Sequence, residues 1–261
     1  MSDGEGGVVV RFGEVADAYA HHRPGYPEAL FDWIAAQVPA RQLAWDAGCG
    51  SGQATVPLAR RFERVVGTDA SAAQLAQAPL RADIEYRKAT AADSGLADNS
   101  ADVVTAGQAL HWFDRPAFYA EAARVLRPGG LLVAWSYGTP ALAELRLQAV
   151  LMQFHRGLLA PYWPAGREHV EEGYARLDFP APRLAVPAFT MGVEWQLDAL
   201  LGYVASWSAV AAYRAQVGAD PMPALAAGLQ PLWPAGHSVA LAWPLSVLCV
   251  RAPWSPTSNP Q

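Results

Sequence analysis

Short apolar runs alternate with amphipathic segments along the first half of the chain. Five strands are predicted by the apolar runs at residues 43–46, 64–69, 84–88, 101–106 and 131–136. Helical spacing of apolar residues, with capping residues or Pro at several starts, characterises residues 27–38, 55–62, 71–75 and 115–125. Because strands that alternate with helices pair in parallel through right-handed crossovers, we predict a mostly parallel sheet up to residue 138.

The pattern changes after residue 138. Residues 141–159 and 197–213 predict helices, and the segment between them is rich in Pro and aromatic residues. Residues 238–243 and 245–251 have the composition of strands, and Pro244 between them predicts an antiparallel pair that turns there. We therefore expect a helical insert after the fifth strand, followed by two strands that complete the sheet.

These changes divide the chain into five predicted parts. They are an N-terminal arm with the first helix (1–38), an α/β core (39–138), a helical insert or cap (139–236), the C-terminal strands (237–252) and a tail (253–261).

Composition and charge narrow the function classes. Hydrophobic residues make up 52% of the chain and charged residues only 16%, so much of it is interior or lines an apolar cavity. The net charge of −5 and the absence of a basic run argue against nucleic-acid partners. Cys49 and Cys249 fit neither a disulfide framework nor a metal site, which favours a reducing cytoplasm. We expect neither a signal peptide nor a membrane span, since no apolar run approaches about 20 residues.

The strongest chemical signal is the segment 45–53, which joins a strand end, an acid, three alternating glycines and a helix start. Gly48, Gly50 and Gly52 allow a sharp turn and a close approach of the backbone to a ligand. Their spacing differs from the G-x-G-x-x-G pattern of dinucleotide sites. Asp69 ends the next strand, where a carboxylate can accept hydrogen bonds from ribose hydroxyls. Adenosine recognition by itself leaves both nicotinamide and sulfonium cofactors open.

Four segments in order resemble the successive motifs of class I S-adenosylmethionine-dependent methyltransferases. They are Asp46–Gly52, Gly67–Asp69, Asp102–His111 and Arg124–Gly130. The resemblance implies an α/β, Rossmann-like class I methyltransferase sheet, mostly parallel with a C-terminal antiparallel hairpin, an N-terminal arm and a helical insert. It also implies S-adenosyl-L-methionine as the cofactor and S-adenosyl-L-homocysteine as the product.

A narrower resemblance extends over almost the whole chain. Phe12, Ala18–Tyr19, Arg23–Pro27, Gln108–Asp114 and Ser206–Tyr213 are similar to the trans-aconitate methyltransferase-like branch. In that branch an N-terminal arm closes over the cofactor, and the likeness suggests a small carboxylic acid as acceptor. The aromatic-rich insert suits a planar natural-product intermediate or heterocycle equally well.

The resemblance places the cofactor contacts at strand ends and in the arm. The cofactor-binding candidates are Tyr19, Arg23, Asp46, Gly48, Gly50, Gly52, Asp69, Ala70, Thr90, Ala91 and Gln108. Arg23 suits the methionine carboxylate, although an acidic substrate or a surface turn are alternatives. Thr90 and Ala92 replace acidic residues common in the superfamily, so backbone contacts at Ala91 gain importance for adenine. Gln108 either contacts the cofactor's amino group or is a buried amide satisfied by loop backbone.

His111 is the one catalytic candidate. As an imidazole it can act as a general base, and the competing interpretation is a packing role beside the cofactor. Direct in-line methyl transfer needs little acid–base help, because the sulfonium is a strong electrophile and alignment supplies much of the acceleration. The substrate candidates are His21, His111, Trp112 and Trp207.

We expect a small-molecule acceptor, no metal, and a monomer or homodimer. The main alternative is a non-catalytic S-adenosylmethionine-binding regulator, which would bind the cofactor without turnover. A nicotinamide oxidoreductase is a third hypothesis, and the glycine spacing disfavours it.

Overall fold

The computed structural model describes residues 24–234 and 236–254, and within them the chain forms two compact units. The α/β unit contains the described residues of 26–138, 168–189 and 244–254, and the helical unit contains those of 24–25, 139–167 and 190–243. Tyr19, His21 and Arg23 lie outside the described residues.

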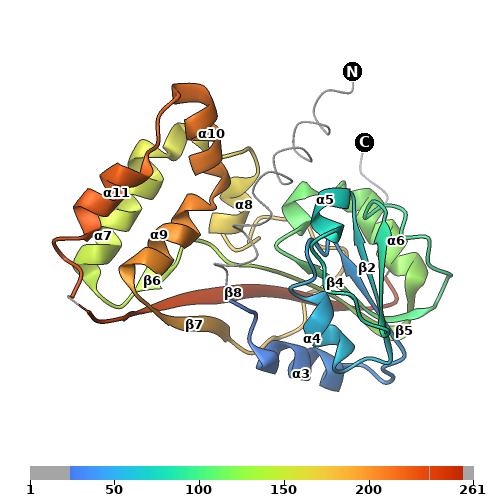
Figure 1. The fold of residues 1–261 in the computed structure, drawn as a ribbon. Helices are drawn as coiled ribbons and strands as arrows, with labels where there is room; N and C mark the ends of the chain where they lie inside the picture. The colour runs from blue at the N-terminus through green and yellow to red at the C-terminus, as the bar shows by residue number, and fades with distance from the viewer. Residues whose placement is uncertain (1–23, 235, 255–261) are drawn as a thin grey trace. The chain divides into compact units, whose positions relative to one another are not determined.

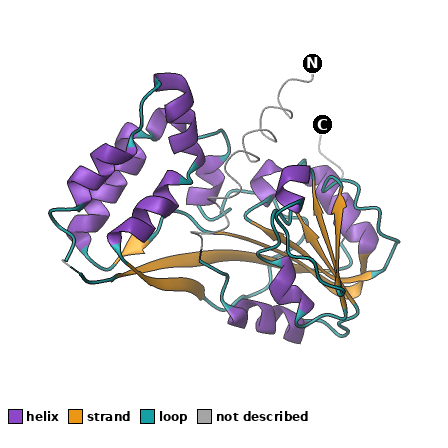
Figure 2. Ribbon diagram, viewed as in Figure 1, coloured by secondary structure: helices purple, strands orange, loops and turns teal. Residues whose placement is uncertain are grey.

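The α/β unit is built on a mostly parallel sheet (Figures 1 and 2). Its strands are β1 (Leu43–Ala47), β2 (Arg64–Asp69), β3 (Ile84–Lys88), β4 (Ala101–Gly107), β5 (Leu126–Ser136) and the part of β8 (Val239–Arg251) from Pro244 onwards. The hydrogen-bonded order is β3-β2-β1-β4-β5-β8-β6, with β8 antiparallel to β5. This mixed sheet confirms the predicted fold class.

Helices cover both faces of this sheet. They are α3 (Glu28–Gln37), α4 (Thr55–Ala59), α5 (Ala72–Leu75), α6 (Arg115–Val125) and the 3₁₀ turn η1 (Leu110–Trp112). Trp45 on β1 packs against Phe118 of α6, whereas Trp135 on β5 packs against Phe31 of α3. The parallel registers place these two tryptophans on opposite faces, so each face has its own buried aromatic anchor.

Local capping matches the sequence prediction at the start of α5. The Ser71 hydroxyl accepts a hydrogen bond from the Gln74 backbone N–H, as expected of an N-cap serine. At α6 the Asp114 carboxylate does the same for the Ala117 N–H. These caps fix where the chain turns from the carboxyl ends of the strands into helices.

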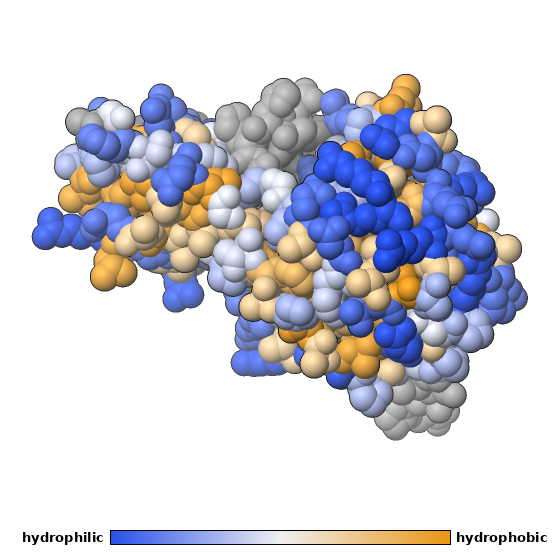
Figure 3. All heavy atoms as spheres, turned by 90° about the horizontal axis from the view of Figure 1, so that it is seen from below, coloured by the Kyte–Doolittle hydropathy of each residue, from blue (hydrophilic) through white to orange (hydrophobic). Residues whose placement is uncertain are grey.

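The helical unit is packed around aromatic side chains. Its elements are β6 (Ala141–Leu142), α7 (Leu145–Gln153), the π-helical turn η2 (Phe154–Leu158), η3 (Ala160–Tyr162), α9 (Leu197–Ala205), α10 (Ser208–Val217) and α11 (Met222–Leu229). Tyr203, Trp207 and Trp243 are buried. The Tyr203 ring packs edge-on against both Trp207 and Trp243. Figure 3 shows one face of this unit, on which apolar residues are mixed with polar ones. Leu145 is an exposed apolar residue of this unit, with 79% of its surface accessible.

Three local predictions need correction. The two C-terminal strands are one strand, β8, that passes through Pro244 without turning. Pro244 is exposed and lies between the residues that pair with β6 and those that pair with β5, where its missing N–H costs no ladder bond. The predicted helix at 197–213 is interrupted at Ser206–Trp207, and the one at 141–159 begins only at Leu145, after a short strand.

One strand was not anticipated. β7 (Phe189–Trp195) pairs with β8, and α8 (Arg167–Glu171) precedes it. Within the described residues, no helix has the length and hydropathy that a membrane span requires. No cluster of three or more potential ligand side chains in those residues could hold a metal ion.

Candidate functional site

The glycine loop follows β1 directly, and each of its three glycines has a positive φ. Gly48, Gly50 and Gly52 have φ values of 65°, 55° and 89°. A Cβ on Gly48 would lie 2.7 Å from the Cβ of Ala109, and one on Gly52 would lie 2.5 Å from the Tyr86 hydroxyl. Among the described residues, the nearest atom to a Cβ on Gly50 is 3.7 Å away. Packing by these residues therefore excludes a side chain at Gly48 and Gly52 but leaves space at Gly50.

Asp69 ties the end of β2 to this loop. Its carboxylate accepts the Gly50 N–H at 2.9 Å and the Ser71 N–H at 2.8 Å. Burial raises the pKa of Asp69, and the two backbone donors act against this rise. A carboxylate has about four acceptor positions, so two remain for hydroxyl donors of a ligand.

Asp46, the last polar residue of β1, is buried beneath the loop. Its two oxygens accept the hydroxyls of Thr55, at 2.6 Å, and Thr105, at 2.8 Å. Burial raises the pKa of Asp46 to about 6, while the two threonine hydroxyls oppose the rise. The carboxylate therefore joins β1, β4 and the start of α4, and it holds the glycine loop from below.

The segment predicted to face adenine continues from β3 beside Asp69. The Ala89 N–H donates to the Asp69 carbonyl at 3.2 Å, and Thr90 forms a single bridge with Asp93. Thr90 is exposed and Ala91 is partly buried. The segment thus lies next to the ribose candidate.

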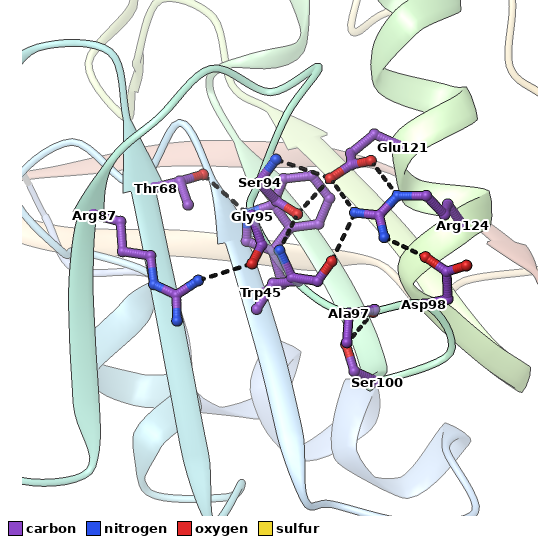
Figure 4. Close-up of polar contacts among 11 residues, drawn as sticks. Trp45, Thr68, Arg87, Ser94, Gly95, Ala97, Asp98, Ser100, Glu121 and Arg124 are labelled. Atoms are coloured by element: carbon purple, nitrogen blue, oxygen red, sulfur yellow. Dashed lines mark hydrogen bonds and ion pairs between the residues drawn. The ribbon is translucent and has the colours of Figure 1, made fainter.

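A charged network secures the loop that follows (Figure 4). The buried Glu121 accepts the N–H and the hydroxyl of Ser94, and Arg124 bridges Glu121, Asp98 and the Leu96 carbonyl. Burial by itself raises the pKa of Glu121, but its hydrogen bonds to Arg124 and Ser94 outweigh it and lower the pKa. This network fixes residues 94–98 against α6.

Gln108 stands at the carboxyl end of β4 in a strained backbone conformation. Its φ is 55°, a value that non-glycine residues seldom adopt. Its backbone N–H donates to the Trp135 carbonyl at 2.8 Å, and its side-chain amide donates to the Tyr137 carbonyl at 2.7 Å. The side-chain oxygen is buried and has no hydrogen-bond partner within the described part of the chain. The described loop backbone therefore accepts a hydrogen bond from the amide nitrogen but donates none to the amide oxygen.

An aromatic group surrounds that strand end. Tyr26 packs edge-on against Trp135, with ring centroids 5.3 Å apart, and lies 6.2 Å from Tyr137. Sequence reasoning did not single out these three residues. Tyr26 falls within the segment quoted for the arm, whereas Tyr137 had no sequence signal.

His111 lies three residues after Gln108, on η1. Its Nδ1 is 2.8 Å from the hydroxyl of Tyr174, a fully buried residue. The neighbouring Trp112 packs against the His111 ring and is 37% exposed. Tyr174 was also missed, because nothing in the sequence around it predicts a contact with residue 111.

The predicted site residues therefore fall into three groups. The largest group belongs to the α/β unit and lies mostly at its carboxyl strand ends. It consists of the glycine loop, Asp46, Asp69, Ala70, Thr90, Ala91, Gln108, His111 and Trp112. Trp207 belongs to the helical unit, where it is buried against His155 and Trp163. Tyr19, His21 and Arg23 lie outside the described residues.

Cys49 lies within the glycine loop, but its thiol has low reactivity. It is buried, and burial raises the pKa of its thiol far above the ordinary range. A thiol that stays protonated is a poor nucleophile, which agrees with a site whose chemistry does not use a cysteine.

Comparisons with known proteins identify the family. A methyltransferase-domain model matches residues 45–134. The chain is 32% identical to a protein of Dictyostelium discoideum described as a methyltransferase, over 82% of each chain. It is also 32% identical to an uncharacterized methyltransferase of Mycobacterium tuberculosis, over 92% of this chain and 94% of that one.

A solved structure is similar over nearly the whole chain. It is described as a type II methyltransferase from Anaeromyxobacter dehalogenans, with 43% identity and a TM-score of 0.82, covering 88% of this chain and 97% of that one. Sequence relatives and fold agree with the ordered motifs. The chain belongs to the class I S-adenosylmethionine-dependent methyltransferases, whose methyl donor is S-adenosyl-L-methionine.

Proposed function

We propose that this methyltransferase acts on a small-molecule acceptor and holds the methyl donor at the carboxyl ends of β1, β2 and β4. The observation that carries the binding site is the buried side-chain oxygen of Gln108, which has no hydrogen-bond partner in the described residues. A buried acceptor without a donor is costly, and a bound ammonium group would satisfy it. The ammonium of the donor's methionine part fits that requirement.

The geometry of the loop supports further proposed contacts. Gly50 leaves space for a ligand to approach the backbone, and Asp69 beside it retains acceptor positions for the two ribose hydroxyls. Ala70, Thr90 and Ala91 are the proposed adenosine contacts, with Ala91 acting through its backbone. Asp46 acts from below the loop, since both its oxygens already accept hydroxyl hydrogen bonds. Gly48 and Gly52 shape the loop.

When bound, S-adenosylmethionine supplies a methyl group on a strongly electrophilic sulfonium. The chain's own residues bind it, orient it and exclude water. His111 and Trp112 lie on η1, directly after Gln108, so they are the proposed residues on the acceptor side. We propose His111 as the group that takes the acceptor's proton where the nucleophile carries one.

The acceptor proposal rests on charge and composition. A net charge of −5 without a basic run suits a small molecule better than a nucleic acid. One relative, 26% identical over 88% of this chain, is a malonyl-[acyl-carrier protein] O-methyltransferase of Xylella fastidiosa, which acts on a carboxyl compound by name. Small carboxylic acids such as aconitate are therefore the first acceptors to examine, with planar heterocycles as the second class. The proposed roles of Tyr19, His21 and Arg23 in the N-terminal arm, and of Trp207 in the helical insert, stay predictions.

Calorimetric titration with S-adenosylhomocysteine tests the binding site. We expect Asp69→Ala and Gln108→Leu to weaken binding at least about tenfold, a change of about 1.4 kcal/mol. Asp32→Ala is the matched control, because that carboxylate is 67% exposed and its ion pair among the described residues is with Arg61. Equal affinities for all three variants would contradict the proposed site.

A panel of acceptors, read by S-adenosylhomocysteine release, tests the reaction. Product from a small acid or heterocycle supports the proposal. Cofactor binding without product from any acceptor in the panel would favour the non-catalytic alternative.

A further inference from the structure

The turn that follows α8 contains two consecutive residues in the left-handed backbone region. Gly173 and Tyr174 both have φ values of 61°. A glycine there is an ordinary way to end a helix. A tyrosine in the same conformation is uncommon and strained, so surrounding structure must hold it.

The turn is held by contacts on both sides. The Gly173 N–H donates to the Val170 carbonyl at 3.0 Å, and the Tyr174 N–H donates to the His169 carbonyl at 2.7 Å. A Cβ on Gly173 would lie 2.2 Å from the Ser246 hydroxyl oxygen on β8. The backbone is therefore pressed against the sheet, and this contact fixes where the next side chain starts.

That side chain enters the core and ends at His111. The Tyr174 ring is fully buried among apolar residues that include Leu177 and Leu248. Its hydroxyl lies 2.8 Å from Nδ1 of His111. Packing alone would be met by phenylalanine, because a buried hydroxyl adds the need for a hydrogen-bond partner. The strained backbone and the hydroxyl both support the contact with His111.

We infer that Tyr174 is a positioning residue, which fixes the orientation and the tautomer of His111 for methyl transfer. In the proposed arrangement the Nδ1–H of His111 donates to the Tyr174 oxygen, and Nε2 is the nitrogen that takes the acceptor's proton. This is the arrangement in which a partner on one ring nitrogen prepares the other for proton transfer. The inference rests on the proposed role of His111 in the reaction.

The step balances as a single displacement with proton transfer. The acceptor's oxygen or nitrogen lone pair forms the new bond to the methyl carbon, and the carbon–sulfur bond breaks with its electron pair left on sulfur. The acceptor's proton passes to Nε2, so the imidazole becomes an imidazolium that keeps its Nδ1–H bond to Tyr174. Bulk water then takes the proton.

The test is nitrogen-15 spectroscopy of the histidine rings in the full-length protein saturated with S-adenosylhomocysteine. His111→Gln identifies the His111 signals among those of the six histidines. At a pH where the ring is neutral, we expect a protonated-type shift for Nδ1 and an unprotonated-type shift for Nε2. In Tyr174→Phe both shifts should move towards the average of two exchanging tautomers.

Tyr119→Phe is the matched control. Tyr119 is also a buried tyrosine, and its hydroxyl donates to the Asp178 carbonyl at 2.7 Å, so this variant loses one buried hydrogen bond away from His111. Its His111 shifts should equal those of the wild type. Unchanged His111 shifts in Tyr174→Phe, or a wild-type ring with its proton on Nε2, would overturn the inference.

Turnover gives a second measurement that separates positioning from stability. With an acceptor from the panel that yields product, Tyr174→Phe should lower kcat about 10- to 100-fold, within what a positioned base contributes, and leave the KM for S-adenosylmethionine unchanged. Equal kcat values for Tyr174→Phe and Tyr119→Phe would contradict the inference. The nitrogen-15 result needs no acceptor, so a panel without product counts against the proposed function and leaves the spectroscopic test decisive.

Discussion

Thr55 donates its hydroxyl hydrogen bond to the Asp46 carboxylate at 2.6 Å, although one residue opens α4 and the other lies near the end of β1. The intervening residues are the glycine loop, which this bond closes from below. Thr105 on β4 contacts the second carboxylate oxygen. The first turn of the helix, two strands and the loop therefore share one buried acid.

Asp46→Asn should change how stability depends on pH. The folded-state pKa of Asp46 is raised from 3.8 to about 6, mainly by burial, so the acid favours folding below pH 3.8 and that contribution is lost as the pH rises through 6. A rise of about two pKa units corresponds to about 3 kcal/mol. The unfolding free energy of Asp46→Asn minus that of the wild type should therefore increase by up to about 3 kcal/mol between pH 4 and 7.

Urea denaturation across that pH range measures the difference. The matched control is Asp32→Asn, whose carboxylate is exposed. A difference that stays constant with pH would show that Asp46 ionises in the folded protein as it does in the unfolded chain.

Gly50→Asn should separate binding from folding. Asparagine tolerates a left-handed backbone, and a Cβ at Gly50 meets nothing within 3.7 Å, so the free energy of unfolding should change by less than about 1 kcal/mol. The new side chain would occupy the space proposed for the cofactor, and affinity for S-adenosylhomocysteine should fall at least about tenfold.

Two alanine variants calibrate this result. Gly48→Ala should destabilise the fold by about 1–3 kcal/mol, because its Cβ would be 2.7 Å from Ala109 and its φ is positive. Gly157→Ala should have little effect, since within the described part of the chain no atom outside its own helix and chain neighbours lies within 4 Å of its Cβ position. Full affinity in Gly50→Asn would remove the argument for a ligand at that position.

Asp102→Ala should be the most destabilising carboxylate substitution in the sheet. The Asp102 carboxylate is 2% exposed and accepts the N–H groups of Gln42 and Leu43, at 2.7 and 3.0 Å, and the Arg127 guanidinium at 2.7 Å. Removing it leaves two backbone donors and a cation without their partner, which costs about 3–5 kcal/mol. A loss below 1 kcal/mol in chemical denaturation, the range of surface ion pairs, would contradict this role.

Glu121→Gln should loosen the loop beside the adenosine segment. The pKa of Glu121 is lowered from its ordinary value of 4.5, so its contribution to stability is present above that value and is lost as the pH falls. We expect a loss of about 1–3 kcal/mol at pH 7 that shrinks towards zero in acid.

Hydrogen exchange of residues 93–98 at pH 7 measures the local effect. Faster exchange should be confined to this loop and to α6, which carries Glu121 and Arg124. Exchange that rises equally throughout the sheet would indicate a global effect instead of the local one proposed.

Neither cysteine should react with a thiol reagent in the folded protein. Cys49 and Cys249 are both buried, and burial raises the pKa of the Cys249 thiol to about 12. Because the thiolate is the reactive form, labelling by a disulfide reagent should appear only on unfolding. Rapid labelling of either thiol under native conditions would contradict the described burial.

The sequence by itself determined the fold class and the position of the glycine loop. Strand and helix periodicity, the glycine triplet and the acid at the next strand end are local signals, since they depend on backbone conformation over a few residues. For the same reason the Ser71 cap was predictable from its own neighbourhood. Chain order also placed Asp69 and the glycine loop at one edge of the sheet, because parallel strands end there. The structure adds the hydrogen bond from the Gly50 N–H to Asp69.

Only the tertiary structure decided the contacts between segments far apart in the chain. Tyr174 reaches His111 across 63 residues, and Thr105 reaches Asp46 across 59. No local pattern records such pairings, because they depend on how whole elements pack. Pro244 shows the same limit: a proline between two strand-like runs predicts a turn, yet β8 continues through it because its neighbours pair with different strands. Packing decided that outcome, and local propensity could not have foreseen it.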